Sequence, residues 1–149
     1  MVIDVKKLKI SGKTQTDFSF EYTPEENLLL LPDAYIDGAI NVFGTLELHE
    51  GDCYVDGTIN CKIVGKCARC VERAEHNFSE EFSVKFVKAN PDLEELEYLY
   101  KSDMVALRQA VNEIIMLNEP QLIYCKENCK GLCPICGSNL NEKDCGCKY

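Results

Sequence analysis

Apolar and polar residues alternate in the first part of the chain, in the pattern typical of β-strands. The segment from Phe18 to Tyr22 alternates strictly, and Val2 to Ile10 mixes apolar residues with lysines. Both segments are therefore predicted to be strands, because side chains in a strand point alternately to opposite faces. Ser11-Gly12 predicts a turn between them, and Thr23-Pro24 ends the second one.

A longer β pattern follows between Ala34 and Lys66, with Glu50-Gly51-Asp52 at its midpoint. This arrangement predicts a long hairpin with a loop at that midpoint. Four glycines within it are predicted to mark bulges or bends that let the sheet curl: Gly38, Gly44, Gly57 and Gly65. Apolar residues from Phe78 to Val87 add a further strand, so three strands are expected to form an antiparallel meander. The pair Cys67-Ala-Arg-Cys70 falls at one of its turns.

The apolar period changes to that of a helix after Asp103. One helical face carries Met104, Leu107, Val111, Ile114 and Ile115, with Asp103 as the expected N-cap and an end near Leu117. The acidic stretch from Ala89 to Asp103 is expected to be a solvated loop or a short exposed helix. The predicted fold class is therefore α+β, with a curled antiparallel meander or barrel-like sheet, one main helix and a C-terminal zinc-ribbon-like segment.

The length of 149 residues and the 46% hydrophobic content fit one domain with a small appendage. We expect an α+β core over residues 1–124 and a cysteine-rich, zinc-binding segment over residues 125–149 that packs on it. Met1 to Ile10 lacks the apolar run of a signal peptide, and no stretch reaches the roughly 20 apolar residues of a membrane span. The expected location is the cytoplasm, where thiols stay reduced and paired cysteines favour metal or redox chemistry.

Six of the ten cysteines lie between Cys125 and Cys147. A Cys-x-x-Cys pair suits zinc, because two intervening residues turn the backbone so that both sulfurs face one point. Eight cysteines make two complete tetrahedral sets, and two zinc ions are expected. The first set is Cys67, Cys70, Cys125 and Cys129, and the second is Cys133, Cys136, Cys145 and Cys147. The first set would clamp the meander to the segment after the helix, whereas the second closes within a short loop.

Other assignments of the cysteines remain open from the sequence. Four thiolates also suit an iron–sulfur cluster, a mixed site could join Cys67 and Cys70 to Cys133 and Cys136, and a single metal would leave thiols free. A thiol redox enzyme using one Cys-x-x-Cys pair is a further alternative, but it needs a strand-to-helix context that neither pair has. The remaining candidate ligands lie outside these motifs: His49 and His76 are assigned to strands or loops, and Cys53 and Cys61 to packing within the hairpin.

The formal net charge of −9 argues against a surface that binds nucleic acid indiscriminately. Residues 21–59 carry nine acidic residues and no Lys or Arg, whereas the segment around Cys67 and Cys70 is basic. Its four cations are Lys62, Lys66, Arg69 and Arg73. They either balance the charge of the thiolates or contact an RNA backbone, and the absence of interleaved aromatic residues disfavours base recognition.

The chain resembles the YceD-like family, which is associated with accumulation of large-subunit ribosomal RNA. The resemblance is carried by three segments: Cys67 to Cys70, Asp103 to Leu117 with Glu113-Ile114-Ile115, and Cys125 through Cys133-Pro-Ile-Cys136-Gly-Ser-Asn-Leu-Asn. It implies a non-enzymatic factor in the biogenesis of the large ribosomal subunit, whose partner is a subunit precursor, a ribosomal protein or ribosomal RNA. The acidic residues 21–59 favour a basic ribosomal protein. No membrane partner and no small-molecule substrate are expected.

Overall fold

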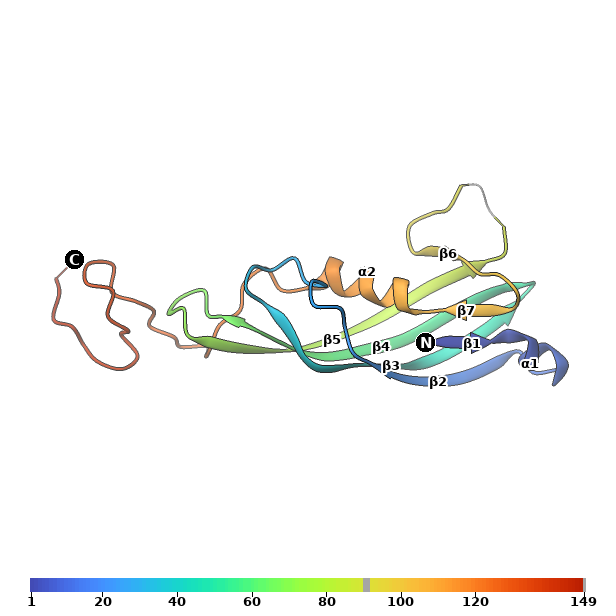
Figure 1. Ribbon diagram of the computed structural model, residues 1–149, viewed down its shortest axis with the longest axis horizontal. Helices are drawn as coiled ribbons and strands as arrows, with labels where there is room; N and C mark the ends of the chain where they lie inside the picture. The colour runs from blue at the N-terminus through green and yellow to red at the C-terminus, as the bar shows by residue number, and fades with distance from the viewer. Residues whose placement is uncertain (90–91, 149) are drawn as a thin grey trace.

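The computed structural model describes residues 1–89 and 92–148, and its main feature is one long, curved sheet (Figure 1). The strands follow each other in the order β2-β3-β4-β5-β6. They span β2 Gln15–Tyr22, β3 Tyr35–His49, β4 Asp52–Lys66, β5 Arg73–Val87 and β6 Glu97–Leu99. All neighbours are antiparallel except β5 and β6, which are parallel.

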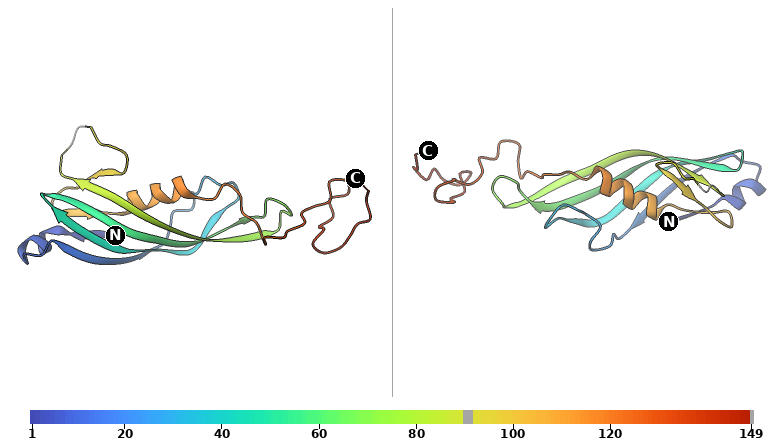
Figure 2. Two further views of the ribbon diagram at one scale, coloured as in Figure 1. Left: turned by 180° about the vertical axis from the view of Figure 1, so that it is seen from behind. Right: turned by 90° about the horizontal axis from the view of Figure 1, so that it is seen from above.

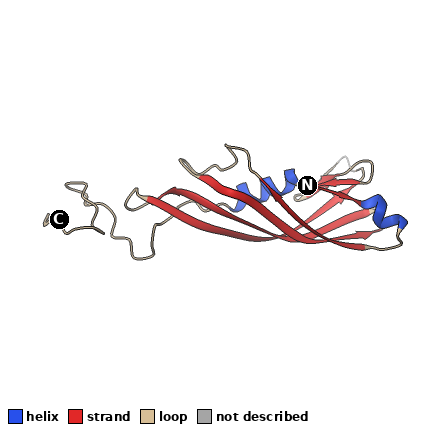
Figure 3. Cartoon of the chain, turned by 60° about the horizontal axis from the view of Figure 1, so that its bottom comes forward, coloured by secondary structure: helices blue, strands red, loops and turns tan. Residues whose placement is uncertain are grey.

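The remaining elements cover one face of this sheet (Figure 3). They are β1 (Val2–Asp4), α1 (Val5–Ile10), β7 (Met104–Ala106) and α2 (Arg108–Asn118), with β1 and β7 paired as a small second sheet. The apolar face of α2 buries Ala110, Val111, Ile114 and Ile115. The opposite face of the large sheet is exposed to solvent over the described residues, as the alternation of exposed and buried residues along β5 shows. None of the helices in the described residues is long and apolar enough to cross a membrane.

The predicted α+β class and the predicted meander are confirmed, and the barrel-like alternative is wrong. Strands β3, β4 and β5 are consecutive and antiparallel, and the sheet stays open between β2 and β6 over the residues described. At its centre Gly44 and Gly57 are direct partners, and Phe18 and Phe82 are their partners on the outer two of these four strands. A Cβ atom on Gly44 would overlap the carbonyl of Asp56, so glycine allows this close approach of the strands.

The prediction of a strand over Val2 to Ile10 holds only for its first part. After β1, Asp4 caps helix α1 by accepting hydrogen bonds from the N–H groups of Lys6 (3.0 Å) and Lys7 (3.4 Å). Val5 and Leu8 are buried one helical turn apart, so the apolar residues fit a helix as well as a strand. A segment this short fits the apolar period of a strand and that of a helix equally well, and the Asp4 cap favours the helix.

The predicted end of the main helix is confirmed near Leu117, but its predicted start is wrong. The helix begins at Arg108, and Leu107 is its N-cap without any side-chain cap. Residues 104–106 form β7 instead, in register with β1 from Val2↔Ala106 to Asp4↔Met104. Asp103 has a positive φ of 55° and pairs with Lys9 at 2.6 Å, so it anchors α1 and does not cap α2.

The acidic segment before Asp103 contains a strand that the sequence pattern did not predict. Strand β6 pairs with β5 from Lys85↔Glu97 to Val87↔Leu99, and the Tyr98 hydroxyl donates a hydrogen bond of 2.6 Å to Glu113 in α2. This strand depends on partners elsewhere in the fold, whereas its own composition favours a solvated loop. Residues 90 and 91 of the segment lie outside the described residues.

Candidate metal centres

The first group of thiols lies at the end of the sheet farthest from α1, where the C-terminal segment meets the turn between β4 and β5 (Figure 1). Cys67 and Cys70 come from this turn, and Cys125 and Cys129 come from the chain after α2. Cys67 forms a parallel bridge with Ile123, whose carbonyl accepts a hydrogen bond of 2.8 Å from the N–H of Ala68. This short pairing brings the two pairs together.

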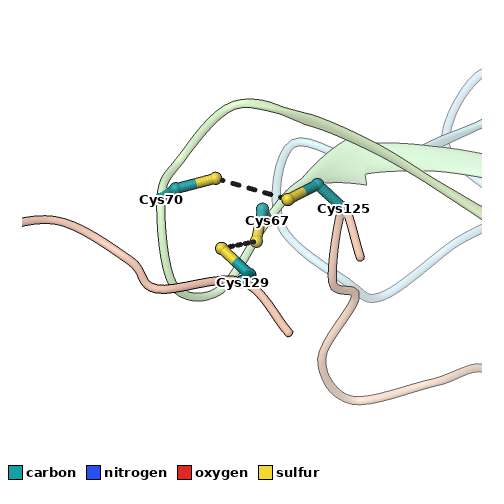
Figure 4. Close-up of side chains that lie close together, drawn as sticks. All are labelled: Cys67, Cys70, Cys125 and Cys129. Carbon is teal, nitrogen blue, oxygen red and sulfur yellow. Dashed lines mark hydrogen bonds between the residues drawn. The ribbon is translucent and has the colours of Figure 1, made fainter. Parts of the chain in front are cut away.

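The four sulfurs of this group point toward one another (Figure 4), and all lie within 4.8 Å of one another. The Sγ atoms of Cys67 and Cys129 are 3.8 Å apart, and those of Cys70 and Cys125 are 3.6 Å apart. Zinc–sulfur bonds of about 2.3 Å in a tetrahedron require sulfurs about 3.8 Å apart. The donor set and its spacing therefore fit a four-coordinate zinc ion, which would be held by these four cysteines.

Hydrogen bonds favour the thiolate form of two of these cysteines. Burial would by itself raise the pKa of the Cys67 thiol, but hydrogen bonds from the backbone of Cys125 and Cys70 lower it to about 6. The pKa of Cys129 is also lowered, chiefly by the side chain of Asn141, whose Nδ2 donates to Cys129 Sγ at 3.3 Å. Since the thiolate is the form that binds metal, these hydrogen bonds favour metal binding by Cys67 and Cys129, whereas burial first, and then the neighbouring sulfurs, raises the pKa of the Cys125 thiol to about 12.

Arg69 joins the turn to the C-terminal segment. Its Nη1 donates hydrogen bonds to the carbonyls of Glu127 (3.1 Å) and Cys129 (3.2 Å), and its guanidinium lies 4.7 Å from the ring centre of Tyr124. The carbonyl of Arg69 in turn accepts from the N–H of Leu132 at 3.2 Å. The C-terminal segment is thus bound to the turn by hydrogen bonds as well as by the thiol group.

The second group of thiols forms within the C-terminal segment itself. The sulfurs of Cys133, Cys136, Cys145 and Cys147 also lie within 4.8 Å of one another. The side-chain hydroxyl of Ser138 lies 3.2 Å from Cys136 Sγ and is the first cause of a pKa lowered to about 6 for that thiol. These donors also fit a tetrahedral zinc ion.

The two thiol groups share a hydrogen-bonded connection. Asn141, in the loop of the second group, accepts from the N–H of Lys130 at 2.9 Å and donates to Cys129 of the first group. The N–H of Leu140 donates to the carbonyl of Gly131 at 2.9 Å. The sequence does not indicate Asn141 as a site residue, because asparagine is not part of the cysteine spacing, and only its hydrogen bond to Cys129 in the folded chain reveals its role.

The two Cys-x-x-Cys turns have the same backbone form but different residues at the next position. Val71 follows Cys70 with a φ of +65°, and Gly137 follows Cys136 with a φ of +73°. Each donates its N–H to the carbonyl of the first cysteine of its pair, at 3.0 Å and 2.9 Å. A β-branched residue in this conformation is strained, whereas glycine is not. The side chain of Val71 is exposed and gains no packing in return.

The predicted RNA or partner contacts in the basic segment all have partners within the chain. Lys66 pairs with Asp33 at 3.0 Å, Lys62 with Glu75 at 3.7 Å, and Arg73 with the same Glu75 at 3.0 Å. Arg69 binds backbone carbonyls as described above. The structure therefore places these cations where they balance nearby carboxylates and hold the turn.

The remaining candidates lie away from both groups. Cys53 is fully buried in β4 and Cys61 is half-buried in the same strand, and burial raises the pKa of the Cys61 thiol to about 11. Their packing fits small apolar side chains. His49 ends β3 and His76 lies in β5, and neither belongs to a potential metal-binding group among the described residues.

The chain is similar to proteins of mycobacteria and matches a family model. Uncharacterized proteins of Mycobacterium bovis and Mycobacterium tuberculosis are 31% identical to the chain over 91 residues, which is 58% of this chain and 44% of theirs. The chain thus spans less than half the length of these curated relatives. No solved structure matches it. A family model described as "Large ribosomal RNA subunit accumulation protein YceD" matches residues 55–149, which include both thiol groups. Because this match covers more than half of its length, the chain belongs to the YceD family.

Proposed function

We propose that the protein is a non-enzymatic, zinc-binding factor in the biogenesis of the large ribosomal subunit, which supports accumulation of its ribosomal RNA through contacts with protein or RNA. The observation that carries this proposal is the pair of four-thiol groups inside the family match. Two zinc ions would serve the fold, because all eight thiols are then used as ligands. No position is left open for a substrate or an activated water at a four-thiolate ion.

The first zinc would act as a clasp between the core, residues 1–124, and the zinc-ribbon-like segment, residues 125–149. Cys70 and Cys125 are 55 positions apart, and closing a loop of that length costs about 3.5 kcal/mol of chain entropy. Binding of a structural zinc supplies roughly 10 kcal/mol or more. The ion therefore outweighs the cost of closure and holds the segment to the sheet.

Protein contact is favoured over direct RNA contact for the partner. The chain carries a net charge of −9, and the basic segment around Cys67 is already paired with carboxylates. RNA binding depends on cations that are free to replace the counterions of phosphate groups. A basic ribosomal protein meets the acidic surface without this difficulty.

The test combines metal analysis with fractionation of ribosomal particles. The purified protein is expected to hold two zinc ions per chain, and Cys125→Ser and Cys145→Ser are each expected to hold one. The tagged protein should sediment with large-subunit precursors, and Cys125→Ser should do so less. Reversible disulfide formation in place of zinc would support a thiol redox enzyme, and iron with a visible absorption band would identify a cluster. Absence of large-subunit components after crosslinking would refute the proposed role.

A further inference from the structure

Strand β2 has a free edge. It is the first strand of the large sheet and, among the described residues, pairs only with β3, in an unbroken register from Gln15↔Glu47 to Tyr22↔Ile40. Backbone N–H and C=O groups of alternate residues therefore point away from the sheet. The eight residues of β2 include no proline, glycine or bulge, which are common features that protect an edge from further pairing. Such an edge can accept an added strand.

An open groove of about 880 Å³ runs along this edge. Phe18 and Phe20 line it from β2, with ring centres 5.7 Å apart, and Val2 and Leu8 line it from β1 and α1. Figures 1 and 2 show α1 next to β2, at the end of the sheet opposite the C-terminus. Side chains of an added strand that point into the groove would therefore meet these apolar side chains, with polar residues such as Lys7 and Ser11 beside them.

The open face of the sheet beside this edge is acidic. Asp17 and Glu21 of β2 point to that face and are exposed, and so is Glu47 of β3. Strand β2 contains no Lys or Arg, and among the described residues none of these three carboxylates takes part in an ion pair. Asp17 accepts one hydrogen bond of 3.0 Å from the hydroxyl of Thr45. Side chains of an added strand on this face would meet negative charge.

We propose that the free edge of β2 binds an extended polypeptide segment in which Lys or Arg alternates with apolar residues. Backbone hydrogen bonds to β2 would hold the segment, its apolar side chains would enter the groove, and its cations would lie beside Asp17 and Glu21. Opposite charges on neighbouring strands attract and like charges repel. A second copy of β2 fits poorly, because its own carboxylates would face those of the first copy.

Lys7 and Lys13 line the groove together with Asp4, whereas Glu21 of β2 is not among its lining residues. The cations of the bound segment are therefore expected on the open face, beside Asp17 and Glu21, and its side chains that enter the groove are expected to be uncharged. This proposal rests on the proposed function only for the protein that supplies the segment, which would be a basic protein of the large subunit.

The experiment uses the full-length protein and a synthetic nine-residue peptide that alternates Lys with Val, labelled for fluorescence anisotropy. Glu21→Lys is expected to weaken peptide binding about three- to tenfold, because one attractive cross-strand pair becomes repulsive. Glu81→Lys makes the same change of net charge and is the matched control, since Glu81 is exposed on the same face in β5, which is separated from β2 by β3 and β4. Its effect on affinity is expected to be small.

Backbone pairing is tested separately from charge. Two peptides are compared, each with N-methyl groups on one of the two sets of alternate residues, so that each keeps its side chains and loses half of its N–H donors. The peptide whose methyl groups point toward β2 is expected not to bind, whereas the other is expected to bind. A peptide of the same composition with its lysines in one block is expected to bind more weakly. Equal binding of the alternating and block peptides, or equal effects of Glu21→Lys and Glu81→Lys, would overturn the proposal.

Self-association and sedimentation with large-subunit precursors give three further outcomes. Self-association of the protein with protected β2 amides in hydrogen exchange would assign the edge to a second copy and overturn the proposal. If the peptide fails to bind while the protein still sediments with large-subunit precursors, strand addition is refuted and the proposed function stands. If the peptide binds but no precursor association occurs, the proposed function fails and the binding edge remains.

Discussion

Replacement of Gly131 by alanine tests whether the C-terminal segment is held against the turn that carries Cys67. Gly131 has a φ of +75°, and a Cβ atom added there would lie 3.1 Å from the carbonyl oxygen of Arg69. Gly137 has a nearly equal φ of +73°, but a Cβ atom there meets nothing within 4 Å. The two substitutions share the backbone strain, so their difference isolates the contact with Arg69.

The expected costs follow from these two geometries. Alanine in the left-handed conformation costs about 1–2 kcal/mol, and the reduced entropy of the unfolded chain returns about 0.5 kcal/mol. Gly137→Ala should therefore cost about 1 kcal/mol. Gly131→Ala adds an overpacking cost of about 1–1.5 kcal/mol, because the backbone of Arg69 must move. A difference of about 1.4 kcal/mol corresponds to a tenfold change in an equilibrium constant.

The assay is urea unfolding of the purified protein, combined with amide hydrogen exchange at Leu132. We expect Gly131→Ala to lower the free energy of unfolding by about 1–1.5 kcal/mol more than Gly137→Ala does. Exchange at Leu132 should become faster in Gly131→Ala, since its N–H donates to the carbonyl of Arg69. Equal free energies of unfolding for the two variants, with unchanged exchange at Leu132, would refute the idea that this contact holds the segment.

Three further predictions concern strain, close packing and pH. Val71→Gly should stabilise the protein by about 0.5–1 kcal/mol in urea unfolding, because it removes a positive φ of 65° from an exposed β-branched residue; a lower midpoint would contradict the strain argument. Gly44→Ala should cost about 3 kcal/mol or more, since a Cβ there overlaps the carbonyl of Asp56 in β4, whereas Gly38→Ala meets only backbone strain; equal urea midpoints for the two would refute this. Burial first, and then the hydrogen bond to Glu113, raises the pKa of Tyr98. The contribution of Tyr98 to the free energy of unfolding is therefore complete below about pH 10 and decreases as the pH rises further. Unfolding free energies measured at pH 9 and 11 should therefore fall more in the wild type than in Tyr98→Phe.

The meander could be predicted because its information is local. The β pattern from Ala34 to Lys66 and the loop at Glu50-Gly51-Asp52 specify β3 and β4, which pair in register around that loop. The end of α2 was equally local, since Pro120, two residues after Asn118, cannot extend a helix. Each of these features depends on residues a few positions apart.

The errors came from contacts between distant segments. Residues 104–106 continue an apolar helical period, yet they form β7 because β1, about one hundred positions earlier, offers a partner edge. Strand β6 likewise requires β5 and the hydrogen bond from Tyr98 to Glu113. A sequence pattern cannot show which distant edge is free, so both strands were missed.

The cysteine spacing by itself predicted two sets of four thiols, since zinc favours four-cysteine sites. The sequence left the division between the sets open, and the fold brings the thiols into two separate groups through the bridge of Cys67 to Ile123. Only the tertiary structure revealed the hydrogen bonds of Arg69 and Asn141, and the free edge of β2. These features depend on where the chain returns in space, which residue spacing does not encode.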